Sequence, residues 1–282
     1  MDGLPWRSAR KWSLEERIGR IADAGFDGVA VSFTDPVSSS RVCQLATDRG
    51  LRVIAMAFPS TVAELRPVLE RAGDLGLGVV DHVNMQPDVR PLTVAECVPL
   101  LEGWQALADD AKVPLLVETH RDRMTCDLLF TVQLLAAVPW LRLTADLSHF
   151  VVGRELRWPI DATSGELIGR VLGRSDAFHG RVASREQVQI QIGFPQHAVW
   201  LELFTVWWSA GFRQYRSTHP ADATLTFTVE LGPPQWYALT GRDGEELSDR
   251  WLEALQLAAL ARRLWSALES EDPMTAGGSS GL

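Results

Sequence analysis

Lysine is almost absent from this chain of 282 residues. It occurs only at Lys11 and Lys112, although lysine and arginine together number 27, so the basic side chains are mostly arginine. This scarcity removes most options for Schiff-base or lysine-acid chemistry. The formal net charge of −9 also argues against nucleic acid as the main partner, because phosphate binding requires a basic surface.

Cysteine and long apolar runs are scarce as well. Cys43, Cys97 and Cys126 show no CxxC spacing, which predicts reduced thiols that pack as small core residues. No apolar run reaches the length of about 18 residues needed to span a membrane, and Met1 to Trp12 lack the pattern of a targeting signal. We therefore expect a cytoplasmic protein with no role in a membrane.

Strand-like and helix-like segments instead alternate along almost the whole chain. The alternation predicts a parallel sheet with right-handed crossovers, and a TIM-type (β/α) barrel is the architecture we favour. Ser13 and Glu16 form a capping-box pattern at the first helix. The expected strands are 27–33, 51–58, 79–85 and four that end near Glu118, Asp146, His179 and Glu230. The expected helices are 13–24, 41–49, 62–75, 94–111, 125–137, 164–172, 198–215 and 247–268.

The first strand of an eight-stranded barrel has no good candidate, since residues 1–6 are too few and lack β-branched side chains. We expect that strand to be short or missing, and the exposed edge it would leave favours a homo-oligomer. An open doubly wound sheet is the rival, but no Gly-rich phosphate loop follows an early strand. We predict a single domain over 1–268 and a disordered tail over 269–282, which contains Gly-Gly-Ser-Ser-Gly.

Metal-binding residue types stand at the ends of the last four expected strands. Glu118, Asp146, His179 and Glu230 would converge on one face if these strands are parallel neighbours. Three carboxylates and one imidazole suit a hard divalent ion, so we expect Mn²⁺, Mg²⁺ or Co²⁺, with Zn²⁺ as the alternative. A polar residue at a strand end is more often simply solvated, and it is the recurrence at four successive ends that favours a site.

Several neighbours of these residues are candidates to line a substrate pocket. His120 and Arg181 each follow a predicted ligand by two residues and would face the same side of the strand. His149, just past a strand end, could contact substrate, ligate a metal or cap a turn. Among eleven tryptophans, Trp236 is a candidate for packing on a sugar face. Trp158 and Trp200 are candidates for the same role.

Four segments resemble motifs of the xylose isomerase-like TIM barrels, the sugar phosphate isomerase/epimerase family. They are VETH at 117–120, DLSH at 146–149, HGRV at 179–182 and VELGPP at 229–234. The resemblance implies a divalent metal held by the four predicted ligands, with Glu118 and Glu230 as acid and base. It also implies that substrate oxygens are bound by His149, by Arg181 or Arg185, and by Gln189, with Gln187 as the second choice.

The function we expect is a metal-dependent isomerase or epimerase. Its substrate would be a sugar-like small molecule, a ketose or related polyhydroxy carbonyl compound, converted through an enediolate. The scarcity of lysine argues against true xylose isomerase chemistry, and the few histidines limit the likeness to endonuclease IV to the fold. Alternatives are a metal-dependent lyase or dehydratase on a keto-polyol or keto-glycoside, and a non-catalytic barrel.

Overall fold

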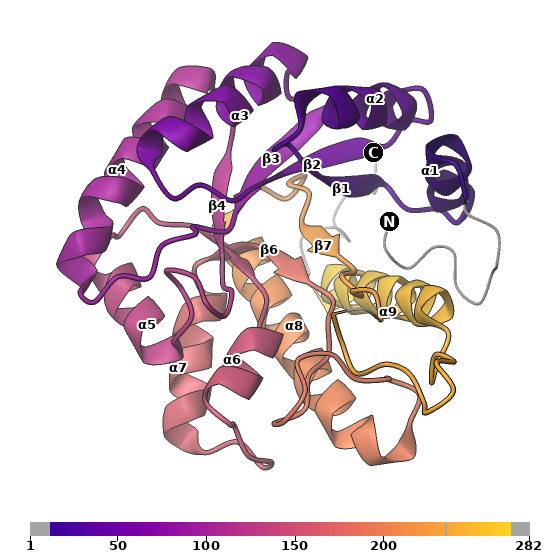
Figure 1. The fold of residues 1–282 in the computed structure, drawn as a ribbon. Coiled ribbons are helices and arrows are strands. Elements are labelled where there is room, and N and C mark those ends of the chain that lie inside the picture. Colours follow the sequence, from indigo (N-terminus) through magenta and orange to yellow (C-terminus); the bar gives the residue numbers. More distant parts are fainter. Residues whose placement is uncertain (1–11, 235, 272–282) are drawn as a thin grey trace, which may run out of the picture.

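Parallel strands form one sheet in residues 12–234 and 236–271, the part of the chain that this computed structural model describes. Seven strands pair in the order β1-β2-β3-β4-β5-β6-β7, and helices surround them as a nearly closed TIM-type barrel (Figure 1). The strands are β1 (Gly28–Ser32), β2 (Arg52–Ala57), β3 (Val80–Met85), β4 (Leu115–Glu118), β5 (Leu143–Ala145), β6 (Ser175–His179) and β7 (Thr226–Thr228).

Helices connect successive strands, as the alternation of the sequence predicted. No helix in this described part is both long and apolar enough to cross a membrane. The helices are α1 (Leu14–Asp23), α2 (Pro36–Thr47), α3 (Val62–Leu75), α4 (Val94–Ala111), α5 (Leu128–Ala137), α6 (Ser148–Gly153), α7 (Ala162–Leu172), the 3-10 turn η1 (Pro195–His197), α8 (Ala198–Thr218) and α9 (Arg250–Glu271).

Local signals explain several boundaries. The predicted capping box of Ser13 and Glu16 is present at the start of α1. Helix α2 begins at Pro36, earlier than the predicted Arg41, because Asp35 caps its first turn and proline suits the first helical position. The predicted first-strand region and residues 272–282 of the predicted tail lie outside the described residues.

Two further predictions need correction. Cys43 and Cys97 are buried as expected, but Cys126 is exposed because it lies in the loop before α5. The final strand is predicted to end near Glu230, whereas β7 ends at Thr228 and Glu230 follows it outside the sheet.

Side-chain contacts join the first and last parts of the barrel. Within the described residues, no ladder of backbone hydrogen bonds connects β1 to β7. Helix α9 packs where the chain enters β1, with Trp251 and Phe26 rings 5.8 Å apart. Nη2 of Arg262 also lies 2.9 Å from Oδ2 of Asp27. We call this contact between α9 and residues 26–27 the seam. Because β1 pairs only with β2 and β7 only with β6 in the described sheet, the seam joins the two ends of the sheet through side chains on the outer side of a barrel that stays nearly closed.

Gly211 of α8 allows that helix to approach β6 closely. A Cβ at this position would lie 2.5 Å from Cε1 of Phe178, a ring that is fully buried.

We therefore expect Gly211→Ala to lower the free energy of unfolding by about 1–3 kcal/mol through overpacking. The matched control is Gly169→Ala in α7, where no atom lies within 4 Å of the added Cβ and a gain of about 0.4–1 kcal/mol is expected. Urea unfolding measures both, and equal stability of Gly211→Ala and the parent would contradict the expectation.

Candidate functional site

Four metal-binding side chains meet at the carboxyl end of the sheet. Glu118 ends β4 and His179 ends β6, whereas Asp146 directly follows β5 and Glu230 follows β7. One ligand atom from each lies within 4.8 Å of the others. The structure thus brings together the complete ligand set that the sequence predicted. TIM barrels carry their chemistry at this end of the strands.

His179 lies at the middle of this cluster. Its Nδ1 is 2.6 Å from Oε2 of Glu230, 3.5 Å from Oδ2 of Asp146 and 3.8 Å from Oε1 of Glu118. The approach to Glu230 lacks hydrogen-bond geometry. Nδ1 of His179, Oε2 of Glu230 and Oε1 of Glu118 are therefore buried without a hydrogen-bond partner among the described residues. Buried polar atoms are normally paired. These converging unpaired atoms fit a divalent cation, which would satisfy them all.

A second layer of polar groups orients the carboxylates. Nδ2 of Asn84 and Nε2 of Gln86 donate to Oε2 of Glu118 at 2.6 and 2.9 Å, which leaves Oε1 for the cluster. The backbone N–H of Ser148 donates to Oδ1 of Asp146 at 3.0 Å, so Oδ2 faces the cluster, where Arg181 also donates to it. The sequence interpretation missed Asn84 and Gln86, although their spacing of two at a strand end places both on one side of the sheet.

The protein environment separates the pKa values of the two glutamates. Burial raises the pKa of Glu118 to about 7; the positive charge of His179 opposes this rise, and the negative charges of Glu230 and Asp146 add to it. Burial also disfavours a charge on Glu230, but Arg181 and His179 outweigh it and hold the pKa of Glu230 at about 2. Two carboxyl groups whose pKa values are pushed apart form the pattern of an acid–base pair.

Solved structures share this fold, although no family model and no curated protein matches the chain. D-allulose 3-epimerase from Methylomonas sp. is 15% identical with a TM-score of 0.57, over 91% of this chain and 92% of that one. D-psicose 3-epimerase from Clostridium cellulolyticum H10 is 13% identical with a TM-score of 0.58, over 92% and 96%. A xylose isomerase-like TIM barrel protein from Mycobacterium smegmatis, in complex with magnesium, is 16% identical with a TM-score of 0.58, over 90% and 89%.

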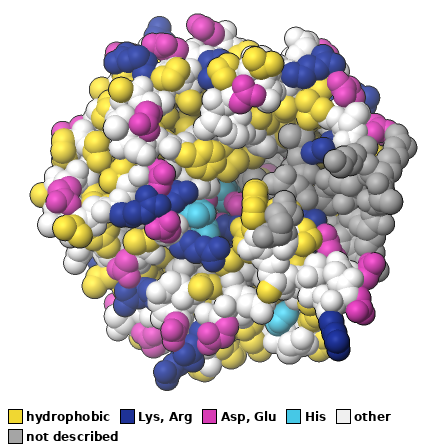
Figure 2. Space-filling model, viewed as in Figure 1, with side chains coloured by type: hydrophobic (Ala, Val, Ile, Leu, Met, Phe, Trp, Pro, Cys, Tyr) yellow, Lys and Arg dark blue, Asp and Glu magenta, His cyan; other side chains and the backbone are white. Residues whose placement is uncertain are grey.

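The chain shares the TIM-barrel fold of these three proteins. In proteins so distant in sequence a shared fold does not carry a function with it. The chemistry of this barrel therefore has to be argued from its own side chains. Viewed along the barrel, histidine, acidic and basic side chains gather near the centre of one face (Figure 2).

Three of the predicted substrate contacts lie beside the metal cluster of this barrel. His149 is buried in α6, the short helix that the sequence analysis did not predict, and its ring packs on that of His120 with centroids 3.9 Å apart. One atom of each ring lies within 4.8 Å of an oxygen of Glu118. Arg181 enters the cluster itself, because it is fully buried and donates to both Asp146 and Glu230.

The other three predicted substrate contacts make different interactions. Nη2 of Arg185 lies 2.7 Å from Oε2 of Glu155 in an exposed ion pair. Gln189 is buried and uses both ends of its amide on the backbone of Gly232, so it holds the loop that follows Glu230. The side chain of Trp236 is on the same loop and is 67% exposed.

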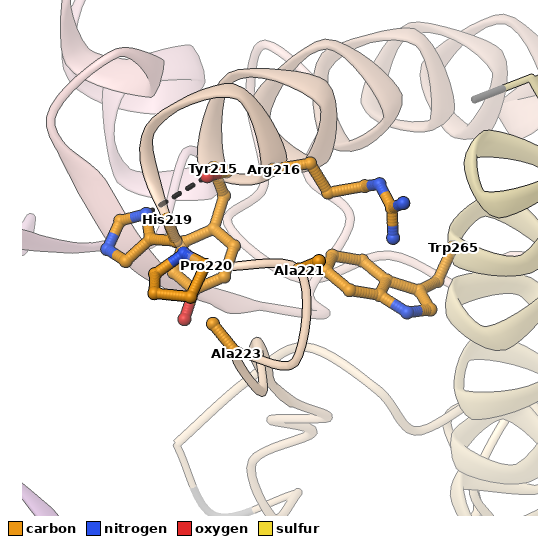
Figure 3. Close-up of a pocket in the computed structure, with 7 residues that line it drawn as sticks. All are labelled: Tyr215, Arg216, His219, Pro220, Ala221, Ala223 and Trp265. Atoms are coloured by element: carbon orange, nitrogen blue, oxygen red, sulfur yellow. Dashed lines mark hydrogen bonds between the residues drawn. The ribbon is translucent and has the colours of Figure 1, made fainter. Parts of the chain in front are cut away.

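A separate small cavity of about 110 Å³ lies where α8 ends and the chain turns toward β7. Figure 3 shows that His219 stacks on Tyr215 there, with ring centroids 3.8 Å apart and Nδ1 of His219 hydrogen-bonded to the Tyr215 carbonyl. This is the amino end of the strands, which in TIM barrels serves stability. We therefore assign no chemistry to this cavity, which Trp265 and Arg216 also line.

Proposed function

We propose that this chain is a divalent-metal-dependent isomerase or epimerase of a ketose or a related polyhydroxy carbonyl compound. The observation that carries the proposal is the convergence of unpaired buried atoms of Glu118, His179 and Glu230 beside Asp146. The fold supports it, because the similar structures include an epimerase in complex with D-allulose and another with D-tagatose.

The four clustered side chains would hold the ion, with Mn²⁺, Mg²⁺ or Co²⁺ suited to their mainly oxygen donors. When bound, the ion would polarise the carbonyl and neighbouring hydroxyl oxygens of the substrate and so acidify the C–H bond of the hydroxyl-bearing carbon. Asn84 and Gln86 would keep Glu118 oriented, since outer-shell partners fix the direction of a metal ligand.

The two glutamates would move the proton. Glu230 has the most exposed side chain of the four at 27%, so we assign it the removal of the carbon-bound proton. Glu118, at the end of a different strand of the cluster, would return the proton. Return to the opposite face of the same carbon would give the epimer, and return to the neighbouring carbon would give the isomer.

Proton exchange in heavy water tests this proposal. With Mn²⁺-loaded protein, we expect D-allulose, D-tagatose or another ketose of a panel to gain deuterium beside its carbonyl carbon and to form an epimer or an aldose. NMR of the recovered sugars measures both. The double variant Glu118→Gln/Glu230→Gln is the control and should show no exchange.

Two outcomes would contradict the assignment. A product that has lost water would indicate a lyase or dehydratase acting through the same enediolate. Bound metal without deuterium exchange into any sugar of the panel would indicate a non-catalytic barrel.

A further inference from the structure

Arg181 is fully buried inside the metal cluster, and protein groups use its whole hydrogen-bonding capacity. Nε carries one hydrogen and each Nη carries two. Nε donates to Oγ of Ser148 at 3.1 Å. Nη1 donates to Oε1 of Glu230 at 2.8 Å and to the Tyr237 hydroxyl at 3.1 Å, and Nη2 donates to Oδ2 of Asp146 and to Nε2 of His149. No N–H of this guanidinium is left for a substrate oxygen.

The contact with His149 determines where that imidazole carries its proton. Nη2 of Arg181 lies 2.7 Å from Nε2 of His149. Arginine can only donate, so Nε2 must be the acceptor. A ring whose Nε2 accepts is neutral and bears its hydrogen on Nδ1. That Nδ1 is buried and has no hydrogen-bond partner in the described protein.

Neighbouring side chains keep His149 and Arg181 in these positions. His120 packs on the ring of His149 and restricts its rotation. Tyr237 reaches Arg181 because Gly232 leaves room for its ring, since a Cβ on Gly232 would lie 1.9 Å from Cε2 of Tyr237. The loop after β7 and the start of α6 thus fix Arg181 from two sides.

We propose that Arg181 is a positioning residue that holds His149 as the Nδ1–H tautomer, so that His149 offers a buried hydrogen-bond donor to an oxygen atom of the substrate. The substrate part of this inference rests on the proposed function. The tautomer part does not, because it concerns the protein alone. Arg181 would therefore act on the substrate only through His149, Asp146 and Glu230.

Removal of the guanidinium should reverse the tautomer. Nε2 of His149 lies 3.7 Å from Oδ2 of Asp146, and this carboxylate oxygen can accept its hydrogen once Arg181 is gone. In Arg181→Met we expect the hydrogen to move to Nε2, where it can be donated to Asp146. Tyr237→Phe is the matched control, because it removes one contact of Arg181 and leaves the contact with His149.

Long-range ¹H–¹⁵N correlation spectra of the full chain, labelled at histidine and loaded with diamagnetic Mg²⁺, provide the readout. His149→Gln assigns the signal by its loss. The parent and Tyr237→Phe should show a protonated Nδ1, and Arg181→Met a protonated Nε2. A protonated Nε2 in the parent protein overturns the proposal without any variant having to fold, and so does an unchanged tautomer in folded Arg181→Met.

Kinetics test the substrate part separately. If an active ketose is found, Arg181→Met should raise KM about tenfold, the loss of about one hydrogen bond of 1.4 kcal/mol. An unchanged KM beside a changed tautomer would reject the donor role of His149 and leave the tautomer assignment standing. Failure of deuterium exchange in the parent would reject the proposed function and leave the spectra interpretable.

Discussion

Exchange of Glu230 for glutamine is expected to weaken divalent-metal binding by at least about 100-fold and to abolish turnover. Loss of an outer-shell partner already costs about 10–100-fold in affinity, and Glu230 is an inward-facing ligand candidate whose Oε2 has no other partner. The substitution also removes a negative charge next to His179, at a contact of 2.6 Å. A glutamine cannot take the carbon-bound proton either, so activity should be lost even at saturating metal.

Elemental analysis after dialysis and titration with Mn²⁺ measure the first effect, and the deuterium-exchange assay measures the second. Glu15→Gln is the control, since it makes the same change of charge in an exposed ion pair with Arg41, between helices α1 and α2. Circular dichroism verifies that both variants are folded. Unchanged metal content would remove Glu230 from the ligand set.

Glu118→Gln is expected to abolish turnover as well, but to stabilise the metal-free protein by about 1–3 kcal/mol above pH 7. The cluster contains three carboxyl groups and, near neutral pH, the positive charges of Arg181 and His179. Burial alone would lower the pKa of His179, but the negative charges of Glu118 and Glu230 outweigh burial and raise it. A glutamine removes the excess negative charge. Its carbonyl can still accept from Asn84 and Gln86, and its amide can donate to the neighbouring carboxylates.

The raised pKa of Glu118 determines how its contribution to the free energy of unfolding changes with pH. The pKa of Glu118 is raised from 4.5 to about 7 in the folded protein, so the unfolded chain releases this proton first. The contribution of Glu118 to stability therefore falls as pH rises from about 4.5 to about 7 and stays constant above that. The advantage of Glu118→Gln over the parent should grow across the same range and then level off.

Urea unfolding in the presence of a chelator, at several pH values between 5 and 8, measures that difference. Added Mn²⁺ should reverse the order, because a ligand that binds only the folded state stabilises it, and the parent would bind the ion far more tightly. Parallel pH profiles of the two proteins would contradict the raised pKa of Glu118.

Periodicity and strand ends were enough to predict much of this fold. Buried strands that alternate with helices led directly to the parallel sheet, and the polar residues at strand ends led to the four side chains of the cluster. Helix α6 was missed because it is short and has no side-chain cap. The extent of β7 was overestimated because apolar alternation continues from Thr228 to Leu231 although the chain has left the sheet.

The contacts of Arg181 and Gln189 could not be predicted in the same way. The spacing from His179 indicates which side of the strand Arg181 faces, but its partners Glu230 and Tyr237 come from a loop about fifty residues later in the chain. Gln189 likewise meets Gly232 only through the fold. Both predicted substrate contacts therefore serve the protein's own polar network in this structure.

The seam between α9 and residues 26–27 bears on how long a bound ion would stay. Glu230 follows β7, which within the described residues is the last strand of the sheet and has a single neighbour. The Arg262–Asp27 contact at the seam is exposed and hence screened by salt. Transient opening there would withdraw Glu230 before the ligands on interior strands β4 to β6. Ion residence time would then depend on ionic strength through a contact remote from the ion.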